Sequence, residues 1–285
     1  MRKVLVLGAG GFLGSRFRRI LVDSYGTYFS SLPINKSNLY NLDALDLFKF
    51  NKLLDEIRPD IVLNCVGFTN VDACEVFPEK SWIINCKLPV NIANICNLKD
   101  IKFVQISTDH YLNMSNKKLL ETDKIGIANQ YSYAKFHAEK MITKVNKSAV
   151  IIRTNFFHFN FNNPKTFLEK LVIASKNNVI THSYDDVWFS PVSTKTLILY
   201  LNKLLDLNFS GLINISSNEV VSKYDFHNAV LECLDINKDS HRPISVDSIK
   251  LKASRPKYMA LNNNKLVDTT GINTPNIYDM ILEEI

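Results

Sequence analysis

The sequence predicts an α/β protein: a Rossmann-type, doubly wound parallel sheet with a smaller C-terminal lobe. Before Arg153, short apolar runs alternate with longer segments of helical period. The runs are continuously apolar, which is typical of strands that helices cover on both faces. A glycine-rich turn follows the first run directly and opens a helix, as it does in doubly wound folds.

The predicted elements follow one another in strand and helix order. We expect buried strands at 4–7, about 27–32, 61–65, 103–106 and 149–152, and helices at about 12–22, 76–96 and 131–145. After Arg153 the pattern loosens into an asparagine-rich loop, a helix at about 166–175 and mixed shorter elements. These patterns predict a dinucleotide-binding domain at 1–155, with returning segments from about 184–210, and a mainly smaller substrate-binding lobe at 156–285.

The composition is that of a soluble globular chain. Of its 285 residues 46% are hydrophobic, which is enough for a sizeable core. The net charge of +6 comes from Lys and Arg scattered along the whole length. This distribution argues against nucleic acid as a partner, although it suits an anionic small ligand. The sequence also lacks an apolar stretch long enough for a membrane span.

Cysteines and the N-terminal run favour a cytoplasmic location. Four of the five cysteines lie between residues 65 and 96 without a CxxC pair, so free thiols in a reducing cytosol are expected. The apolar run near the start is too short for a signal peptide, and glycine interrupts it. The six histidines show no metal-ligand spacing, and Asp185 and Asp186 are expected to be solvated acids, so no metal site is predicted.

The glycine turn is the first candidate binding site. In GAGGFLG, Gly8, Gly11 and Gly14 are three residues apart between the first strand and the helix. A tight turn, close approach of backbone N–H groups to a pyrophosphate and packing of helix on strand each exclude a Cβ atom. We therefore predict that this turn, with Phe12 and Leu13, binds a dinucleotide cofactor.

The residues at the end of the second strand indicate whether the cofactor's ribose carries a 2′-hydroxyl or a 2′-phosphate. The segment LPINKSN has no acidic residue to bind a free ribose 2′-OH. Asn35, Lys36 and Ser37 could instead face a 2′-phosphate, which favours NADP(H) over NAD(H), while the alternative is a solvated loop.

A tyrosine and a lysine in YSYAK form the second candidate site. Tyr131 and Lys135 are one helical turn apart on the same face, whereas Tyr133 points elsewhere, toward packing or solvent. A neighbouring ammonium favours the ionised phenol, which makes the tyrosine a better proton-transfer group near neutral pH. Upstream, a buried strand ends in Ser107, Thr108 and Asp109, where parallel sheets bind their ligands. These motifs in this order predict a hydride-transfer site.

In the order and spacing of these motifs, the sequence resembles the extended short-chain dehydrogenase/reductases, and among them the dTDP-4-dehydrorhamnose reductase family. The likeness covers nearly the whole length, through GAGGFLG, LDALD, RPDIVLNCVGFTNVDACE, ISTDH, YSYAK, IIRTNFF, SPVS, GLINIS and ASRPKYMALNNNKL. Two positions depart from the family pattern: His110-Tyr111-Leu112-Asn113 stands where Tyr-Val-Phe and an acidic loop are usual, and Phe156 where Trp is common. Both concern the substrate, so the resemblance leaves the sugar open.

The resemblance implies roles for individual residues. It places Thr108, Tyr131 and Lys135 on the family's catalytic triad, and Tyr131 and Lys135 are also expected to contact the cofactor. For the cofactor it implies Asp43 and Ala44 beside the adenine, Cys65, Val66 and Gly67 on the nicotinamide side, and Asn155 after the next strand. For the substrate it implies Thr108, Asp109, Phe156 and Arg255. Trp188 could stack on a base or sugar, or pack in the core of the second lobe.

The implied activity is NAD(P)H-dependent reduction of the C4 ketone of a nucleotide-linked 4-keto-6-deoxy sugar, in deoxysugar and surface-polysaccharide biosynthesis. Two alternatives stay open. One is an epimerase or epimerase-reductase, for which the only Cys and His candidates are Cys65, Cys74, His158 and His182. The other is a non-catalytic NADP-binding subunit similar to the regulatory subunit of methionine adenosyltransferase. Homodimers are frequent among similar proteins.

Overall fold

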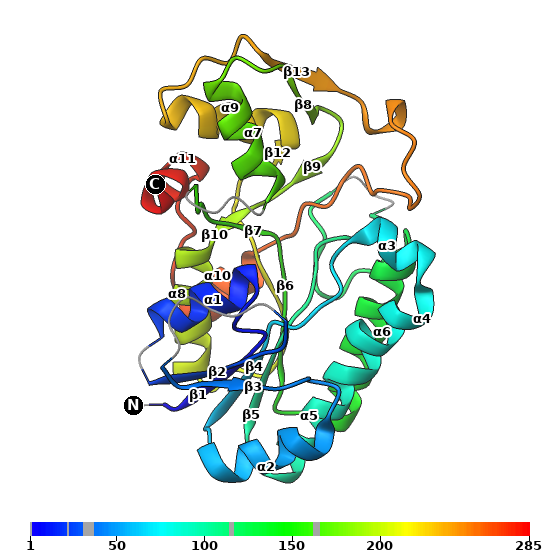
Figure 1. Cartoon of the computed structure of the whole chain (residues 1–285), viewed down its shortest axis with the longest axis vertical. Helices are drawn as coiled ribbons and strands as arrows, with labels where there is room; N and C mark the ends of the chain where they lie inside the picture. Colours follow the sequence, from blue (N-terminus) through cyan, green and yellow to red (C-terminus); the bar gives the residue numbers. More distant parts are fainter. Residues whose placement is uncertain (1, 22, 31–36, 114–116, 162–165) are drawn as a thin grey trace. The chain divides into compact units, whose positions relative to one another are not determined.

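The computed structural model describes residues 2–21, 23–30, 37–113, 117–161 and 166–285 (Figure 1). Asn35 and Lys36 lie outside these ranges. The elements up to the sixth strand are β1 (Val4–Leu7), α1 (Phe12–Ile20), β2 (Ser24–Tyr28), β3 (Leu39–Asn41), α2 (Leu47–Ile57), β4 (Ile61–Asn64), α3 (Val71–Val76), α4 (Pro78–Trp82), the π-helical turn η1 (Ile83–Lys87), α5 (Leu88–Leu98), β5 (Lys102–Ile106), α6 (Gln130–Val145) and β6 (Val150–Thr154).

Shorter strands prevail in the rest of the chain. In order, these elements are β7 (Phe156–Phe157), α7 (Phe167–Lys176), β8 (Thr181–Tyr184), β9 (Trp188–Phe189), β10 (Val192–Ser193), α8 (Thr194–Asp206), β11 (Gly211–Ile215), β12 (Val221–Ser222), α9 (Lys223–Cys233), β13 (His241–Ile244), the 3₁₀ turn η2 (Val246–Ser248), α10 (Asn264–Thr270) and α11 (Ile277–Glu284).

The central sheet has seven strands in the order β11-β6-β5-β4-β1-β2-β3. β1 pairs in parallel with β2 on one side and with β4 on the other, and β5 and β6 continue the parallel pairing beyond β4. The chain therefore winds outward from β1 to β3 and then returns to start again at β4. This confirms the predicted doubly wound fold, and it puts a topological switch point between the carboxyl ends of β1 and β4.

Helices cover both faces of the sheet, as the continuously apolar strands predict. Leu5 and Leu7 of β1 belong to a buried cluster together with residues of α2, α5 and α6. The alternate residues Val4 and Val6 point to the opposite face and are also buried. In Figure 1, α1 lies on the side of the sheet away from α5 and α6. Helix α1 contacts β1 and β2.

Some predicted element bounds were wrong for identifiable reasons. The helix expected at 76–96 begins instead at Pro78 and runs through α4, η1 and α5 to Leu98, while Val76 ends the separate helix α3. Proline cannot continue a helix but suits its first turn. The second strand begins at Ser24 and ends at Tyr28, earlier than expected, and Leu32 lies outside the described residues. Its sequence SYGTY is too polar and glycine-containing to give the apolar signal on which the prediction relied.

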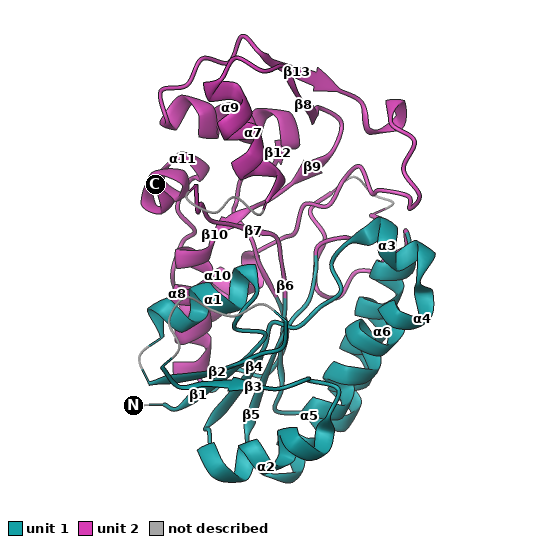
Figure 2. Ribbon diagram, in the orientation of Figure 1, with its two compact units in different colours: residues 1–108, 129–152, 208–213 teal, residues 109–128, 153–207, 214–285 magenta. Residues whose placement is uncertain are grey.

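The chain divides into two compact units, coloured in Figure 2. Unit 1 comprises residues 1–108, 129–152 and 208–213 and holds most of the central sheet, while unit 2 comprises residues 109–128, 153–207 and 214–285. The segment that returns to unit 1 is thus 208–213, where the sequence suggested about 184–210. Unit 2 is built on the two-stranded pairs β10-β7, β12-β9 and β13-β8.

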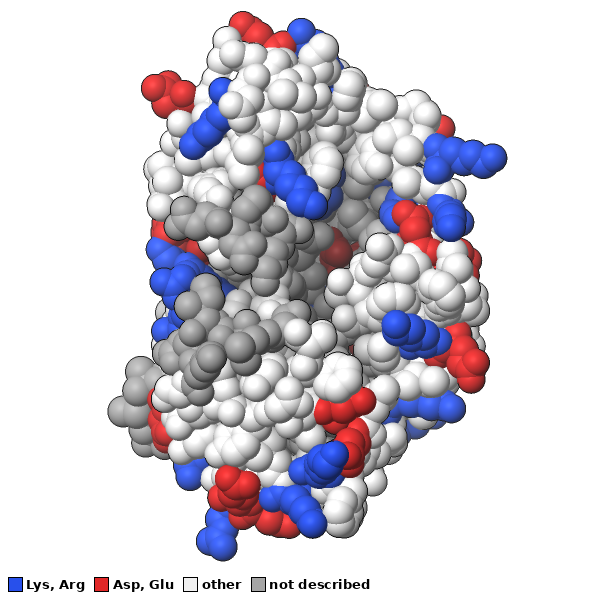
Figure 3. Space-filling view, viewed as in Figure 1, with Lys and Arg blue, Asp and Glu red and all other residues white. Residues whose placement is uncertain are grey.

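The surface shows mixed charge. On the face drawn in Figure 3, Lys and Arg side chains alternate with Asp and Glu, a distribution unlike a continuous basic stripe. Among helices of the described residues, none combines the length and apolarity that crossing a bilayer requires.

Candidate active site

The glycine turn has the geometry that its spacing predicts. Gly8 has φ +79°, a conformation that favours glycine. A Cβ on Gly14 would lie 2.3 Å from the carbonyl oxygen of Gly8, so only glycine lets α1 approach β1 this closely. Gly11 caps α1, and its N–H donates to the Gly8 carbonyl at 2.9 Å. The first N–H groups of α1 therefore stand at the carboxyl end of β1, an arrangement that suits a pyrophosphate.

The segment after β4 packs against this turn. A Cβ on Gly8 would lie 3.2 Å from both the backbone nitrogen and a side-chain methyl of Val66. The segment is held from the other side by Asn85 of the π-helical turn η1, which accepts from the N–H of Phe68 and donates to its carbonyl, each at 2.9 Å. The structure thus brings Gly8, Cys65 and Val66 together at the switch point.

Of the residues expected near the adenine and the 2′ group, the structure describes Asp43, Ala44 and Ser37. Asp43 accepts from the N–H of Leu45 at 3.0 Å and so shapes the turn before α2, while Ala44 packs on the core cluster. The carbonyl of Ser37 accepts from the guanidinium of Arg18 at 2.6 Å, which ties this residue to α1.

Tyr131 and Lys135 are both buried in α6, with 9% and 6% of their surfaces exposed. Tyr133, between them in sequence, is 42% exposed and packs its ring on Trp82 and His137, with centroids 5.6 and 4.4 Å away. The two tyrosines therefore have different surroundings, and Tyr131 shares the buried face of α6 with the lysine.

The start of α6 is fixed by three polar groups. Asn129 caps the helix by accepting from the N–H of Ser132 at 2.9 Å, and the Ser132 hydroxyl accepts in return from the Asn129 N–H. Glu75, from α3, accepts from the N–H of Gln130 at 3.0 Å. A carboxylate at this end also suits the helix dipole. Tyr131 follows directly and is held in the first turn.

The ammonium of Lys135 is tied to the end of β5, where it donates to the carbonyl of Ile106 at 2.8 Å. Burial lowers its pKa to about 8, while Glu139 and Cys65 act in the opposite direction. Burial raises the pKa of the Cys65 thiol, so this cysteine is neutral at physiological pH.

The next residues of the β5 end are buried as well. Ser107 donates from its hydroxyl to a carboxylate oxygen of Glu139 at 2.5 Å, and its N–H donates to the carbonyl of Ile152 at 2.7 Å. Thr108 is 5% exposed. The hydroxyl-bearing strand end and the Tyr-Lys helix thus meet within unit 1.

Unit 2 contains a second polar cluster, centred on Asp109. Its carboxylate accepts from the side-chain amide of Asn155 at 2.8 Å. Burial raises the pKa of Asp109 to about 6, against the opposing influence of Lys223 and Asn155. The ammonium of Lys223 lies 3.3 Å from the centroid of the Phe189 ring, and burial lowers its pKa to about 8, with Asp109 opposing.

Lys223 was missed in the sequence, although one signal was there. It is the first residue of α9, capped by Ser222. A cation is unfavourable at a helix N-terminus, so a lysine at this position needs another reason. Asp109 is such a reason, but it lies more than a hundred residues away in the chain.

The remaining substrate candidates also lie in unit 2. Trp188 is 38% exposed, and it borders an open pocket of about 670 Å³ with Asp186, Val220, Lys257 and Tyr258. Phe156 is partly buried in β7, paired with Val192. Arg255 donates to the carbonyl of Ala253 at 3.0 Å.

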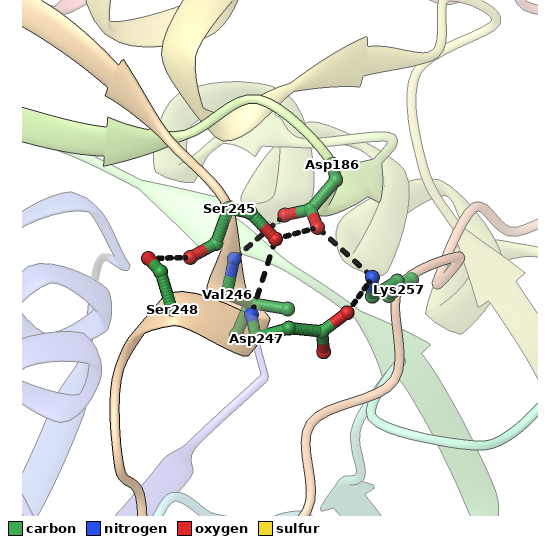
Figure 4. Close-up of polar contacts among 6 residues, drawn as sticks. All are labelled: Asp186, Ser245, Val246, Asp247, Ser248 and Lys257. Atoms are coloured by element: carbon green, nitrogen blue, oxygen red, sulfur yellow. Dashed lines mark hydrogen bonds and ion pairs between the residues drawn. The ribbon is translucent and has the colours of Figure 1, made fainter.

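Figure 4 shows the polar contacts that Asp186 and Lys257 make at the edge of this pocket. Asp186 binds Lys257 at 3.0 Å and also accepts from the Ser245 hydroxyl at 2.6 Å and the Val246 N–H at 2.9 Å. Lys257 is paired with Asp247 as well. The expectation that Asp186 is a simply solvated acid was therefore wrong, because the residue closes an ion-pair network.

Fold and site together define an NAD(P)-dependent oxidoreductase: a glycine turn at the switch point of a doubly wound sheet, with a buried tyrosine and lysine on one helix. The family model described as the RmlD substrate binding domain matches residues 1–284, and the chain therefore belongs to this family. This confirms the resemblance to dTDP-4-dehydrorhamnose reductases.

Curated relatives are similar over nearly the whole chain. A protein named probable low-salt glycan biosynthesis reductase Agl14, from Haloferax volcanii, is 25% identical and aligns with 96% of this chain and 94% of its own. The dTDP-4-dehydrorhamnose reductase of Mycolicibacterium smegmatis is 25% identical over 93% and 79% of the two chains. Methionine adenosyltransferase 2 subunit beta of Mus musculus is 24% identical over 95% and 83%.

Solved structures share the fold at lower identity. The dTDP-4-dehydrorhamnose reductase of Bacillus anthracis, in complex with NADP, has a TM-score of 0.89 at 22% identity and covers 99% of this chain and 98% of its own. The Bordetella bronchiseptica enzyme WbmH, in complex with NAD+, has a TM-score of 0.81 at 16% identity over 99% and 96%.

Proposed function

We propose that this chain reduces the C4 ketone of a nucleotide-linked 4-keto-6-deoxy sugar, in the manner of a dTDP-4-dehydrorhamnose reductase, within deoxysugar or surface-polysaccharide biosynthesis. The observation that carries the proposal is the buried pair Tyr131 and Lys135 on α6, in a member of this reductase family. The names of the reductases from Haloferax and Mycolicibacterium support it. The free cysteines suit a reducing cytosol, where we place the activity.

Each catalytic residue has a task that follows from its surroundings. The bound nicotinamide supplies the hydride. Tyr131 donates a proton to the oxygen of the ketone as it becomes an alkoxide. Lys135, a cation held at the end of β5, favours release of that proton by the phenol. Thr108 stabilises the same oxygen with a hydrogen bond.

We assign the cofactor to the turn formed by Gly8, Gly11, Phe12, Leu13 and Gly14, whose geometry fits a pyrophosphate. Cys65, Val66, Gly67 and Asn155 would face the nicotinamide, and Asp43 and Ala44 the adenine. NADP(H) is preferred over NAD(H), because the segment after β2 has no acidic residue for a free 2′-hydroxyl.

For the substrate we assign Asp109 and Lys223 to the sugar, Phe156 to its apolar face, and Arg255 and Trp188 to the nucleotide. Asp109 and Lys223 each oppose the effect of burial on the other's pKa, and two opposite charges placed in one polar cluster favour a role in binding. Carboxylate and ammonium together can accept and donate hydrogen bonds to sugar hydroxyls.

The epimerase alternative is the weaker one. Burial raises the pKa of both Cys65 and Cys74, so neither thiol supplies a thiolate base near neutral pH.

A panel of dTDP-, GDP-, UDP- and CDP-linked 4-keto-6-deoxy sugars tests the proposal, each with NADPH and with NADH, followed at the nicotinamide absorbance. We expect rapid oxidation of NADPH with at least one sugar and slower oxidation of NADH. Stoichiometric NADP binding without reduction of any sugar would overturn the enzymatic role in favour of a binding subunit. Solvent deuterium at C3 or C5 of the product would show that epimerisation takes place.

A further inference from the structure

Glu139 is a buried carboxylate to which the proposed mechanism gives no task. It lies on α6 one helical turn after Lys135, and only 3% of its surface is exposed. Burying a carboxylate costs several kcal/mol unless a partner compensates it. We therefore expect partners nearby that compensate the buried carboxylate of Glu139.

A hydrogen bond fixes the position of this carboxylate, and a second one holds Lys135 at the same strand end. The hydroxyl of Ser107, at the end of β5, donates to it at 2.5 Å. The same strand end holds Lys135, whose ammonium donates to the carbonyl of the preceding residue, Ile106, at 2.8 Å. Residues four apart on a helix share one face, so Glu139 and Lys135 are both directed at the end of β5.

Other ionisable groups near this part of α6, among the residues that the structure describes, are less suited to supply the negative charge. Cys65, after β4, raises the pKa of Lys135 less than Glu139 does, and burial raises its own pKa, which disfavours the thiolate. Cys86, in η1, contacts Met141 on another part of α6. Glu75, from α3, is bound to the first N–H of the helix. Among the groups that oppose the effect of burial on the pKa of Lys135, Glu139 has the largest influence.

We propose that Glu139 is a positioning residue that supplies the counter-charge of Lys135, and that Ser107 fixes its carboxylate for this purpose. The inference rests on the proposed function, in which Lys135 acts as a cation. Without this charge, the lysine would stay on the strand carbonyl but lose its proton more readily, so the phenol of Tyr131 would lose the neighbouring positive charge.

Glu139→Gln tests the proposal, because glutamine keeps the size and an oxygen for Ser107 while it removes the charge. The lysine pKa of about 8 already includes the favourable effect of Glu139, so it should fall further in the variant. We expect the alkaline limb of the pH profile of kcat/KM to move about one unit toward acid, a tenfold loss on that limb, with activity largely restored at lower pH. Glu79→Gln, an exposed change on α4, is the matched control and should leave the profile unchanged.

A second measurement does not depend on activity. In protein labelled with 13C at the lysine ε-carbon, the Lys135 resonance, assigned by its loss in Lys135→Met, should titrate at lower pH in Glu139→Gln. Ser107→Ala should shift it in the same direction by less, and this variant serves if Glu139→Gln does not fold.

The outcomes separate the two proposals. If Lys135→Met retains full turnover, the catalytic assignment fails. If Lys135→Met is inactive but neither the pH profile nor the lysine titration moves in Glu139→Gln, the function stands and the role of Glu139 is refuted.

Discussion

The two units each hold a lysine whose pKa burial lowers to about 8 and an acidic residue that opposes the effect, Lys135 with Glu139 in unit 1 and Lys223 with Asp109 in unit 2. Their settings differ. Lys135 is bound to a strand carbonyl, and its acid is four residues away on the same helix, whereas Lys223 lies over an aromatic ring and its acid comes from a distant loop. In the proposed function, the first pair adjusts the proton donor Tyr131, and the second pair binds the sugar.

The strongest effect should come from the helix of unit 1. Tyr131→Phe removes the proton donor, so we expect kcat to fall by about 10²- to 10⁴-fold while the dissociation constant for NADPH changes little. Tyr133→Phe is the matched control on the same helix, exposed and packed on Trp82, and it should retain activity. Equal losses in both variants would show that the helix is merely structural.

Next in size is a change in the glycine turn. Gly14→Ala places a Cβ 2.3 Å from the Gly8 carbonyl, and since overpacking costs about 1–3 kcal/mol, NADPH binding should weaken by about 10- to 100-fold. Gly271→Ala, at φ +70° in unit 2, should cost about 1 kcal/mol of stability and leave cofactor affinity unchanged. Fluorescence titration measures the affinity for NADPH, and urea denaturation measures the stability. Unaltered NADPH binding in Gly14→Ala would show that the turn does not bind the cofactor.

Acid should affect unit 2 first, because five of the six histidines, all but His137, lie there. Burial lowers the pKa of His227 and lowers that of His241 to about 4. Below about pH 6.5 the unfolded chain therefore binds protons that the folded chain does not bind. The free energy of unfolding should be highest above this pH and fall by on the order of 2 kcal/mol toward pH 4.

Each unit carries one of the two tryptophans, so this prediction can be read unit by unit. Trp82→Phe leaves Trp188 to report unit 2, and Trp188→Phe leaves Trp82 to report unit 1. Urea midpoints that fall equally for both reporters, or that do not fall with acid, would contradict a local origin in the unit 2 histidines.

The smallest expected effect separates the two lysines by kinetics. Lys223→Met should raise KM by about tenfold with kcat nearly unchanged, because a residue that binds the unreacting part of a substrate contributes equally to ground and transition states. Lys135→Met should instead lower kcat. A drop in kcat without change in KM for Lys223→Met would contradict a role of Lys223 in substrate binding alone.

The sequence predicts what depends on neighbouring residues. The glycine turn and the Tyr-Lys spacing could be found because each needs only a few consecutive positions, and the continuously apolar strands predict their own burial. The break before Pro78 was also within reach, since proline signals it locally. Three-residue β3 escaped notice because it is partly exposed and offers no apolar run.

Pairings across the chain could not be predicted in the same way. Ser107 and Glu139 are 32 residues apart, and only the packing of α6 against β5 brings them together. Lys223 could be noticed as a misplaced cation, but its partner could not be named. Asp186 looked like a solvated acid because nothing near it in sequence shows that Ser245 and Lys257 will surround it.

The π-helical turn η1 constrains the number of residues in this part of the chain, and not only their types. A π turn contains one residue more than an α turn, so it is in effect a fixed insertion within a longer helix. Deleting one residue between Ile83 and Lys87 would restore an α-helix and rotate Asn85 by about 100° away from Phe68. The loop that packs on the glycine turn would then lose both of its hydrogen bonds to this side chain, although no residue of the loop itself had changed. The number of residues in this turn is therefore as important to the site as their identity.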